Sequence, residues 1–191
     1  MSDLEFDPQA HRYTLDGRVL PSVTQILDPY QDWGAVPPDV MAAAKDRGTR
    51  VHAACALIAD GLIGSEDCDE DIQPYLRQFE RFLAESGFTL HLSEGRVHSS
   101  LGYAGTLDLY GDLPKRKKSL IDIKSGSVPR SAGPQTAAYA RALRETLGHE
   151  ARYRYALLLT PERYKLVQLD DPRDDQIFLA ALTMHNWSNR K

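Results

Sequence analysis

Hydrophobic residues recur at helical spacing in two stretches of the chain. Between Asp39 and about Ala59 they fall three, four or seven positions apart, which predicts an amphipathic helix. A second stretch with this pattern runs from about Ile72 to Ser86, and the glycine directly after it is a typical helix stop. Each segment is therefore expected to place one face against a core.

Apolar residues in the middle of the chain predict three successive strands. The segment "FTLHLSEGRVHSSLGYAGTLDLYGDL" predicts a strand, a turn and a strand, and "SLIDIKSG" predicts the third strand. The basic turn Lys115–Lys118 separates the second strand from the third. A later segment, "RYALLLTPERYKLVQL", predicts a hairpin that turns at Pro161–Arg163.

Local signals indicate the remaining elements. They are a hairpin at Asp16-Gly17, a helix capped by Ser22 and Gln25, a helix from near Pro134, and a closing helix with Asp171 as its cap and Pro172 first. The helix start at Ser22 could also hold an anion, but capping is the simpler interpretation. The order of elements predicts an α/β fold, a mixed β-sheet flanked by helices, in a single domain over residues 1–191.

Composition narrows the class of protein. With 42% hydrophobic and 26% charged residues the chain resembles an ordinary soluble globular protein, and no apolar run approaches the ~20 residues that span a bilayer. The acidic start "MSDLEFDPQAH" lacks the apolar centre of a secretory signal, so we expect a cytoplasmic protein. Cys55 and Cys68 are too few for a disulfide framework or a four-cysteine iron–sulfur cluster.

The net charge argues against a protein that coats nucleic acids but is compatible with a metal-dependent enzyme. A formal charge of −4 is unlike that of proteins that simply coat nucleic acids, but it is compatible with an enzyme that gathers carboxylates around a metal. The basic turn is either a solvated turn, the simpler interpretation, or a phosphate contact.

Asp122 and Lys124 place opposite charges on one face of the third strand, because side chains alternate between the two faces of a strand. A carboxylate followed two places later by lysine is expected about once by chance in this composition, so the pair alone is uninformative. Asp108 interrupts the preceding strand in the same way, and Glu94 ends a row of inward positions on the strand before that one. Three successive strands thus each present a carboxylate.

Carboxylates that converge need a cation between them. Two like charges ~4 Å apart repel by about 4 kcal/mol at an effective dielectric of 20. Mg²⁺ or Mn²⁺ fits a site of carboxylate, carbonyl and water oxygens. Lys124 would then assist a metal-bound water or stabilise the charge that develops on phosphorus.

Two helices carry further candidates. His52 lies one turn after Gly48, so the two share a face, and the imidazole could reach the carboxylates as a nitrogen ligand. A lone histidine on such a helix is more often structural. Gln135 and Tyr139 are likewise one turn apart, on the helix after "DIKSG", where packing is an equally good interpretation.

Five motifs in order make the pattern specific. "RGTRVH", "SEG", "GYAGTLD", "DIKSG" and "QTAAY" resemble the motif series of RecB-like nucleases in the PD-(D/E)XK superfamily. The opening "LPSVTQIL" is similar to that of phage-encoded and mitochondrial single-domain relatives. The resemblance spans about residues 11–140. The chain lacks the four cysteines of relatives with an iron–sulfur cluster, and it lacks helicase domains.

The resemblance implies a role for each motif residue. The metal ligands would be His52, Asp108, Asp122 and the Ile123 carbonyl; Lys124 would be the catalytic lysine, with Glu94 in or near the site; Gln135 and Tyr139 would organise the site and hold DNA. The Ser125–Ser127 loop and Arg130, just after the third strand, are candidates for phosphate contacts.

The sequence therefore predicts a Mg²⁺- or Mn²⁺-dependent deoxyribonuclease that hydrolyses phosphodiester bonds from DNA ends in recombination or repair, with a phage or prophage origin. Two alternatives stay open, a structure-selective endonuclease on the same core and an inactive nuclease fold that binds DNA or protein. A strand-annealing recombination protein is the partner that the resemblance implies, and no membrane is expected.

Overall fold

A computed structural model describes residues 4–31 and 36–189. Its strands are β1 (Leu4–Asp7), β2 (Arg12–Leu15), β3 (Arg18–Leu20), β4 (Thr89–Ser99), β5 (Tyr103–Leu113), β6 (Arg116–Ser125), β7 (Tyr153–Leu159) and β8 (Tyr164–Gln168). Its α-helices are α1 (Val23–Leu27), α2 (Pro38–Ala59), α3 (Gln73–Ser86), α4 (Ala132–Leu147) and α5 (Asp174–Ser188), with short 3₁₀ turns at Asp28–Tyr30 and Ser65–Asp67.

The main sheet has five strands in the order β4-β5-β6-β7-β8. All neighbours are antiparallel except β6 and β7, which run parallel and are joined by the crossover helix α4. A separate antiparallel sheet, β1-β2-β3, lies beside β4 and β5. The prediction of a mixed sheet flanked by helices is confirmed.

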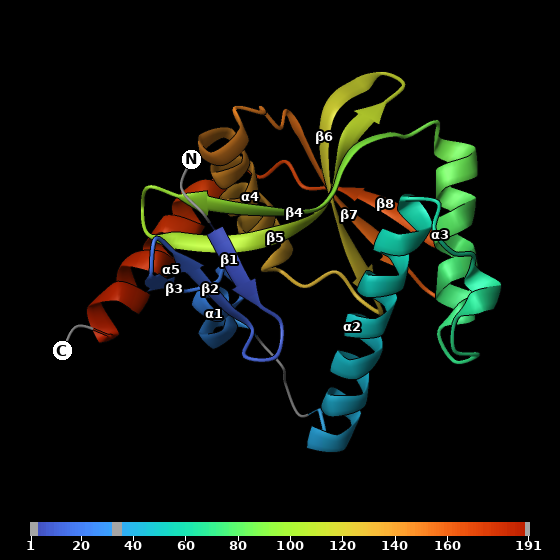
Figure 1. Cartoon of the computed structure of the whole chain (residues 1–191), viewed down its shortest axis with the longest axis horizontal. Coiled ribbons are helices and arrows are strands. Elements are labelled where there is room, and N and C mark those ends of the chain that lie inside the picture. Colours follow the sequence, from blue (N-terminus) through green and yellow to red (C-terminus); the bar gives the residue numbers. More distant parts are fainter. Residues whose placement is uncertain (1–3, 32–35, 190–191) are drawn as a thin grey trace.

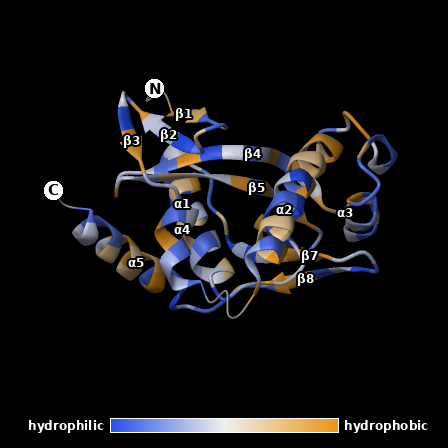
Figure 2. Cartoon of the chain, turned by 90° about the horizontal axis from the view of Figure 1, so that it is seen from below, coloured by the Kyte–Doolittle hydropathy of each residue, from blue (hydrophilic) through white to orange (hydrophobic). Residues whose placement is uncertain are grey.

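Helices cover both faces of the main sheet (Figure 1). On one face α2 and α3 share an apolar cluster with strand residues that include Leu109, Ile121 and Leu157. On the other face α1, α4 and α5 share a second cluster, which includes Leu107 and Leu120. Figure 2 shows the two groups of helices again on opposite sides of the molecule. No helix among the described residues has the length and apolar character to cross a membrane.

Several local predictions are confirmed. Asp16 and Gly17 both have positive φ, 50° and 77°, and connect β2 to β3. Ser22 caps α1, because its Oγ accepts the Gln25 N–H at 3.0 Å while its own N–H donates to the Gln25 side chain at 2.9 Å. Gly87, at φ 65°, ends α3 in the left-handed conformation.

Two local predictions need correction. The closing helix starts at Asp174 and not at Pro172, because the Asp171 carboxylate accepts the Arg173 N–H at 2.9 Å and holds a turn before the helix. In α2 only the second half is buried, and Val40, expected on the apolar face, is 52% exposed. The first half of α2 therefore extends away from the core (Figure 1).

A buried ion pair attaches α5 to the sheet. Arg154 of β7 contacts Asp174 at 3.0 Å and donates to the Gly133 carbonyl at 2.8 Å. Both side chains are mostly buried, at 16% and 8% exposure. Removing one partner of a buried pair leaves an uncompensated charge in the interior.

We expect Asp174→Ala to lower the free energy of unfolding by about 3 kcal/mol, measured by urea denaturation. An Arg154→Met, Asp174→Ala double variant, which buries no charge at this position, should recover part of that loss. The control is Arg81→Ala, which breaks an exposed pair with Glu85 and should cost about 0.5 kcal/mol or less. Equal losses in the two single variants would contradict a special role for the buried pair.

Candidate active site

The site lies where β5 and β6 separate. Their pairing runs as far as Leu109 with Ile121, and Asp108 is the next residue of β5. Its carboxylate Oδ2 accepts the Ile123 N–H at 2.6 Å, so a side chain serves as the acceptor for this strand amide. Asp108 is 9% exposed. The strand geometry therefore holds one carboxylate at the point where the sheet opens.

Asp122 and Lys124 project together from β6, as the alternation of the strand predicts. Lys124 Nζ lies 2.7 Å from Asp122 Oδ2, and the side chains are 17% and 2% exposed. The same ammonium donates to Gln135 Oε1 at 3.1 Å, and Gln135 Nε2 donates to the Tyr139 hydroxyl at 3.3 Å. The predicted glutamine–tyrosine pair of α4 thus continues the chain of polar contacts that begins at Asp122.

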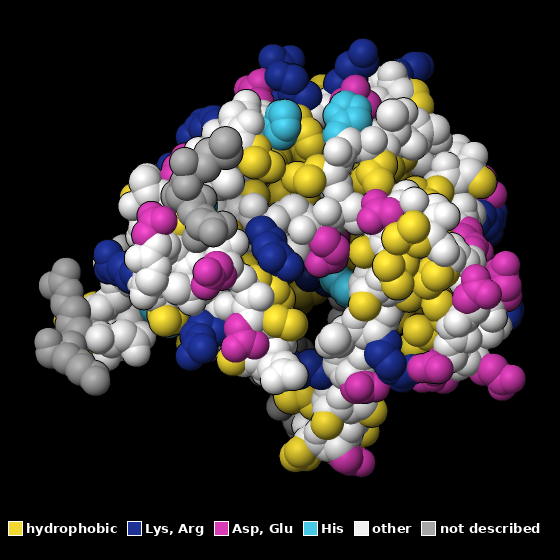
Figure 3. Space-filling model, viewed as in Figure 1, with side chains coloured by type: hydrophobic (Ala, Val, Ile, Leu, Met, Phe, Trp, Pro, Cys, Tyr) yellow, Lys and Arg dark blue, Asp and Glu magenta, His cyan; other side chains and the backbone are white. Residues whose placement is uncertain are grey.

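His52 of α2 closes the site from the opposite side. Its Nδ1 lies 3.1 Å from Asp108 Oδ1, at hydrogen-bond distance. Gly48, one turn earlier, lies beside the end of β6, where an added Cβ would be 3.7 Å from Ser125 Oγ. That is an ordinary contact, so close approach of the strand does not strictly require glycine here. Figure 3 shows a hollow beside α2 with acidic, basic and histidine side chains around its edge.

The charges of the site depend on one another. Burial disfavours the Lys124 ammonium, but Asp122 and Asp108 outweigh burial and raise the pKa of Lys124. Burial raises the pKa of Asp122. The positive charge of Lys124 lowers this pKa, and the negative charge of Asp108 raises it further. For Asp108 burial is outweighed by His52, Lys124 and the Ile123 N–H, which lower its pKa. Lys124 thus opposes the effect of burial on the pKa of Asp122, and the 2.7 Å contact pairs the two groups.

Glu94 lies across from Asp108, at the rim. The β4–β5 register pairs Ser93 with Leu109 and Gly95 with Leu107, which places Glu94 opposite Asp108. The register shift of β4 lies between Leu90 and Leu92, before this position. Glu94 has a positive φ of 48° and is exposed. Partial desolvation, and then repulsion from Asp108, raise its pKa to about 7.

Two predicted phosphate contacts, Ser125 and Arg130, follow Lys124 in the chain. Ser125 ends β6 beside α2, and Arg130 is exposed in the segment that leads to α4. No contact made by Arg130 to another described side chain is recorded. A role for either residue in binding phosphate stays a prediction, as does a role for the Ile123 carbonyl as a ligand.

The structure adds two residues that the sequence did not single out. Gly105 of β5 accommodates the Tyr139 ring, because an added Cβ would lie 2.5 Å from Tyr139 Cε1. A glycine inside a strand is the signal that could have indicated this close approach. Arg47 of α2 lies near Gly126, stacks over Tyr75 at 5.5 Å, and has a buried Nε without a hydrogen-bond partner among the described residues.

The carboxylate and imidazole side chains of the site are of the kinds that bind a hard divalent cation, although they are not arranged around a single metal position. Across residues 4–31 and 36–189 no three His, Cys, Asp or Glu side chains form a group that would hold a metal as they are. Asp108 contacts His52 and accepts a hydrogen bond from the Ile123 N–H, and Asp122 contacts the Lys124 ammonium. Asp122 Oδ2 is nevertheless buried and accepts no hydrogen bond of ordinary geometry. A metal would compete with these contacts for the oxygens.

Comparison with known proteins assigns neither a family nor an activity. No protein-family profile and no curated protein matches the chain. Among solved structures, a Eubacterium rectale protein described as a "Putative exonuclease" is similar over 90% of this chain and 74% of its own, with 11% identity and a TM-score of 0.49. The solved protein SSO0001 is similar over 61% of this chain and 58% of its own, with 11% identity and a TM-score of 0.35. Likeness at this level carries no functional conclusion.

In metal-free protein we expect the Glu94 carboxyl to titrate at about pH 7, followed by ¹³C NMR in EDTA. Asp108→Asn should lower that pKa, because it removes the repelling charge across the strand pair. Asp108→Asn is compared with Asp67→Asn, a carboxylate variant in the 3₁₀ turn Ser65–Asp67. Titration of Glu94 at the usual value of a free glutamate would contradict this electrostatic description.

Proposed function

We propose that the chain is a Mg²⁺- or Mn²⁺-dependent nuclease that hydrolyses DNA phosphodiester bonds. The observation that carries this proposal is the meeting of two buried carboxylates, Asp108 and Asp122, with the Lys124 ammonium at the open end of β5 and β6. The motif series that resembles RecB-like nucleases supports the same conclusion, because its residues from α2, β5, β6 and α4 come together here. This arrangement suits a reaction in which negative charge accumulates on phosphorus-bound oxygens.

Asp108 and Asp122 would hold the metal, with His52 and the Ile123 carbonyl as further ligands and Glu94 close by. Hard divalent cations favour such oxygen donors, and the mutual repulsion of the carboxylates favours a cation between them. When bound, the metal would supply Lewis-acid activation of a water and neutralise charge on the phosphate. His52 would exchange its contact with Asp108 for one with the cation.

Lys124 serves as a fixed positive charge in this proposal. Its raised pKa favours the protonated form at neutral pH, so it suits charge stabilisation better than proton abstraction. Gln135 orients the ammonium through the 3.1 Å hydrogen bond, and Tyr139 in turn positions Gln135. The α4 helix therefore positions the catalytic lysine from outside the metal ligands.

We further propose action from DNA ends, in recombination or repair, as the RecB-like motif series implies. The same resemblance supports a strand-annealing recombination protein as the partner. Linear duplex DNA should then be degraded while relaxed closed circles of the same sequence stay intact, measured by gel electrophoresis. Cleavage of closed circles at a similar rate would identify an endonuclease on the same core.

We expect Lys124→Met to lower the rate of DNA hydrolysis by about 100-fold or more, because it removes the charge that stabilises the transition state. The assay uses end-labelled linear DNA with Mg²⁺ or Mn²⁺, and EDTA should abolish cleavage. The matched control is Lys165→Met, an exposed lysine of β8. Full activity of Lys124→Met would contradict the catalytic role.

Lys124→Met also leaves Asp122 unpaired in the interior, so folding has to be checked independently. We expect Mn²⁺ binding, measured by electron paramagnetic resonance, to persist in Lys124→Met and to weaken at least ~10-fold in Asp108→Asn and Asp122→Asn. Asp67→Asn, in the exposed acidic loop before α3, should bind as the wild type does. Unchanged Mn²⁺ affinity in both carboxylate variants would contradict the ligand assignment.

A further inference from the structure

Positive charge gathers at one edge of a molecule whose net charge is −4. Figure 3 shows basic side chains along this edge, over the β5–β6 turn. The predicted basic turn Lys115–Lys118 is mostly strand, because β6 begins at Arg116. We define the basic edge by these four residues, one from α4 and one from the segment before β7: Lys115, Arg116, Lys117, Lys118, Arg144 and Arg152. The interpretation of the turn as merely solvated does not account for the two arginines that other elements add to it.

Direct contacts link Lys118 with Arg152, and shared neighbours link Arg116 and Arg144 to the same surface. The Arg152 N–H donates to the Lys118 carbonyl at 2.8 Å. Lys118 Nζ and Arg152 Nε also reach the same oxygen of Glu150, at 3.3 and 3.1 Å. Arg116 stacks over the Tyr153 ring at 5.4 Å and donates to Gln168, and both of these partners line the pocket that Arg144 and Arg152 also line.

The charges of this surface are not balanced locally. Glu150 is the carboxylate that pairs with its cations, and it is shared by two of them. Even with the nearby carboxylates of Asp112 and Asp170 included, six cations face three carboxylates, a surplus of three. No ion pair or hydrogen bond is recorded for the side chains of Lys115, Lys117 or Arg144 among the described residues. These three are therefore available to an external anion.

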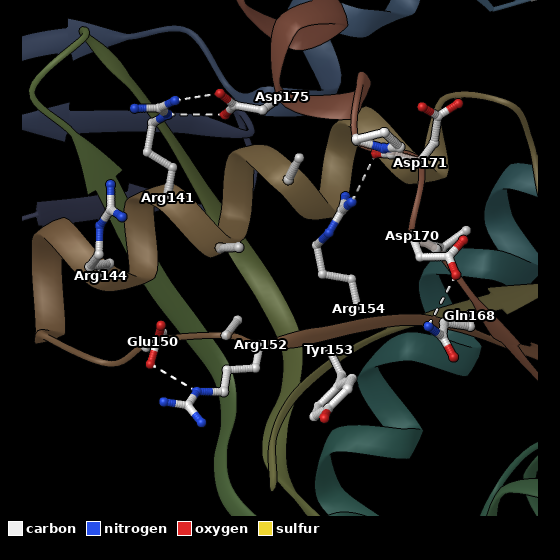
Figure 4. Close-up of a pocket in the computed structure, with 15 residues that line it drawn as sticks. Arg141, Arg144, Glu150, Arg152, Tyr153, Arg154, Gln168, Asp170, Asp171 and Asp175 are labelled. Atoms are coloured by element: carbon white, nitrogen blue, oxygen red, sulfur yellow. Dashed lines mark hydrogen bonds and ion pairs between the residues drawn. The ribbon is translucent and has the colours of Figure 1, made fainter. Parts of the chain in front are cut away.

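A cavity of about 490 Å³ continues the surface between α4, β7, β8 and the start of α5 (Figure 4). Its other arginines are already engaged, since Arg141 pairs with Asp175 at 2.6 Å and Arg154 with Asp174 at 3.0 Å. Figure 4 shows Arg144 without a marked partner, while Arg152 is paired only with Glu150. Among the described residues, Arg144 is thus the lining arginine without a carboxylate partner.

The basic edge and the candidate active site lie at opposite ends of β6. From Lys117 to Asp122 the strand advances five residues, or about 17 Å at ~3.4 Å per residue. Successive phosphates of one DNA strand advance ~3.4 Å along the duplex axis, so about five nucleotides would cover this distance. Figure 3 shows both the basic edge and the hollow beside α2 on one face of the molecule.

We propose that the basic edge is a second contact surface for the phosphodiester backbone of DNA, about five nucleotides from the scissile bond. This inference rests on the proposed nuclease function, which supplies the substrate. A lipid surface is a poorer fit, because membrane-bound basic patches combine cations with inserted apolar side chains. Within the described part of the chain, Leu147 is the one large exposed apolar residue close to this surface in sequence.

The test is DNA binding without metal, so that no cleavage is needed. Fluorescence anisotropy with a labelled 20-base-pair duplex in EDTA is measured over a range of salt concentrations. Lys115→Ala, Lys117→Ala should bind about 10-fold more weakly near 0.1 M salt. The slope of log affinity against log salt should fall by about 1.8, because each lost phosphate contact removes ~0.9. Arg144→Ala alone should lower the slope by about 0.9.

The matched control is Arg163→Ala, Lys165→Ala, which removes the same net charge from exposed positions at the β7–β8 turn. It should leave the slope unchanged. Equal losses in both double variants, or tighter binding to anionic phosphatidylserine vesicles than to DNA, would overturn the assignment. Wild-type protein that binds DNA through the basic edge but cleaves none would remove the nuclease proposal and leave this surface in place.

Discussion

The hydrogen bond from the Ile123 amide to the Asp108 carboxylate is the contact on which the site depends. A buried amide without an acceptor is costly, and an acceptor that carries a charge contributes about 1.5–3 kcal/mol. Because the acceptor is a side chain and not a strand carbonyl, β5 and β6 separate here without losing this bond. The separation places Asp108 and Asp122 at the open end of the strand pair, while β6 keeps its pairing with β7 through Ser125.

The site is assembled at some cost in stability. Asp122 and Lys124 form a largely buried salt bridge, and apolar residues of similar size in those positions would often be at least as stable. At Asp122 the attraction of Lys124 exceeds the repulsion from Asp108, and burial is the cause that still raises the pKa of this carboxyl. This charge arrangement is therefore better explained by a role in chemistry than by a role in folding, since burial alone would disfavour it.

Much of this geometry could be predicted from the sequence because it follows from fixed periods. Strand alternation placed Asp122 and Lys124 on one face, and the helical turn placed Gln135 near Tyr139. Features that depend on distant packing could not be predicted in this way. The position of Arg47 depends on where α2 crosses the end of β6, and the solvent exposure of the first half of α2 depends on where the core ends. Neither is encoded in local spacing.

The parallel pairing of β6 with β7 also sets an order of events during synthesis. β6 gains its second neighbour only after α4 and β7 have been made, since β7 follows β6 by a full crossover. Gln135, which orients Lys124, lies within that crossover. A chain still emerging from the ribosome therefore carries its acidic residues in an unfinished sheet, with one edge of β6 unpaired. The sheet around Asp122 is complete only when residues through Leu159 have left the exit tunnel, so a product truncated before β7 would lack the parallel neighbour of β6.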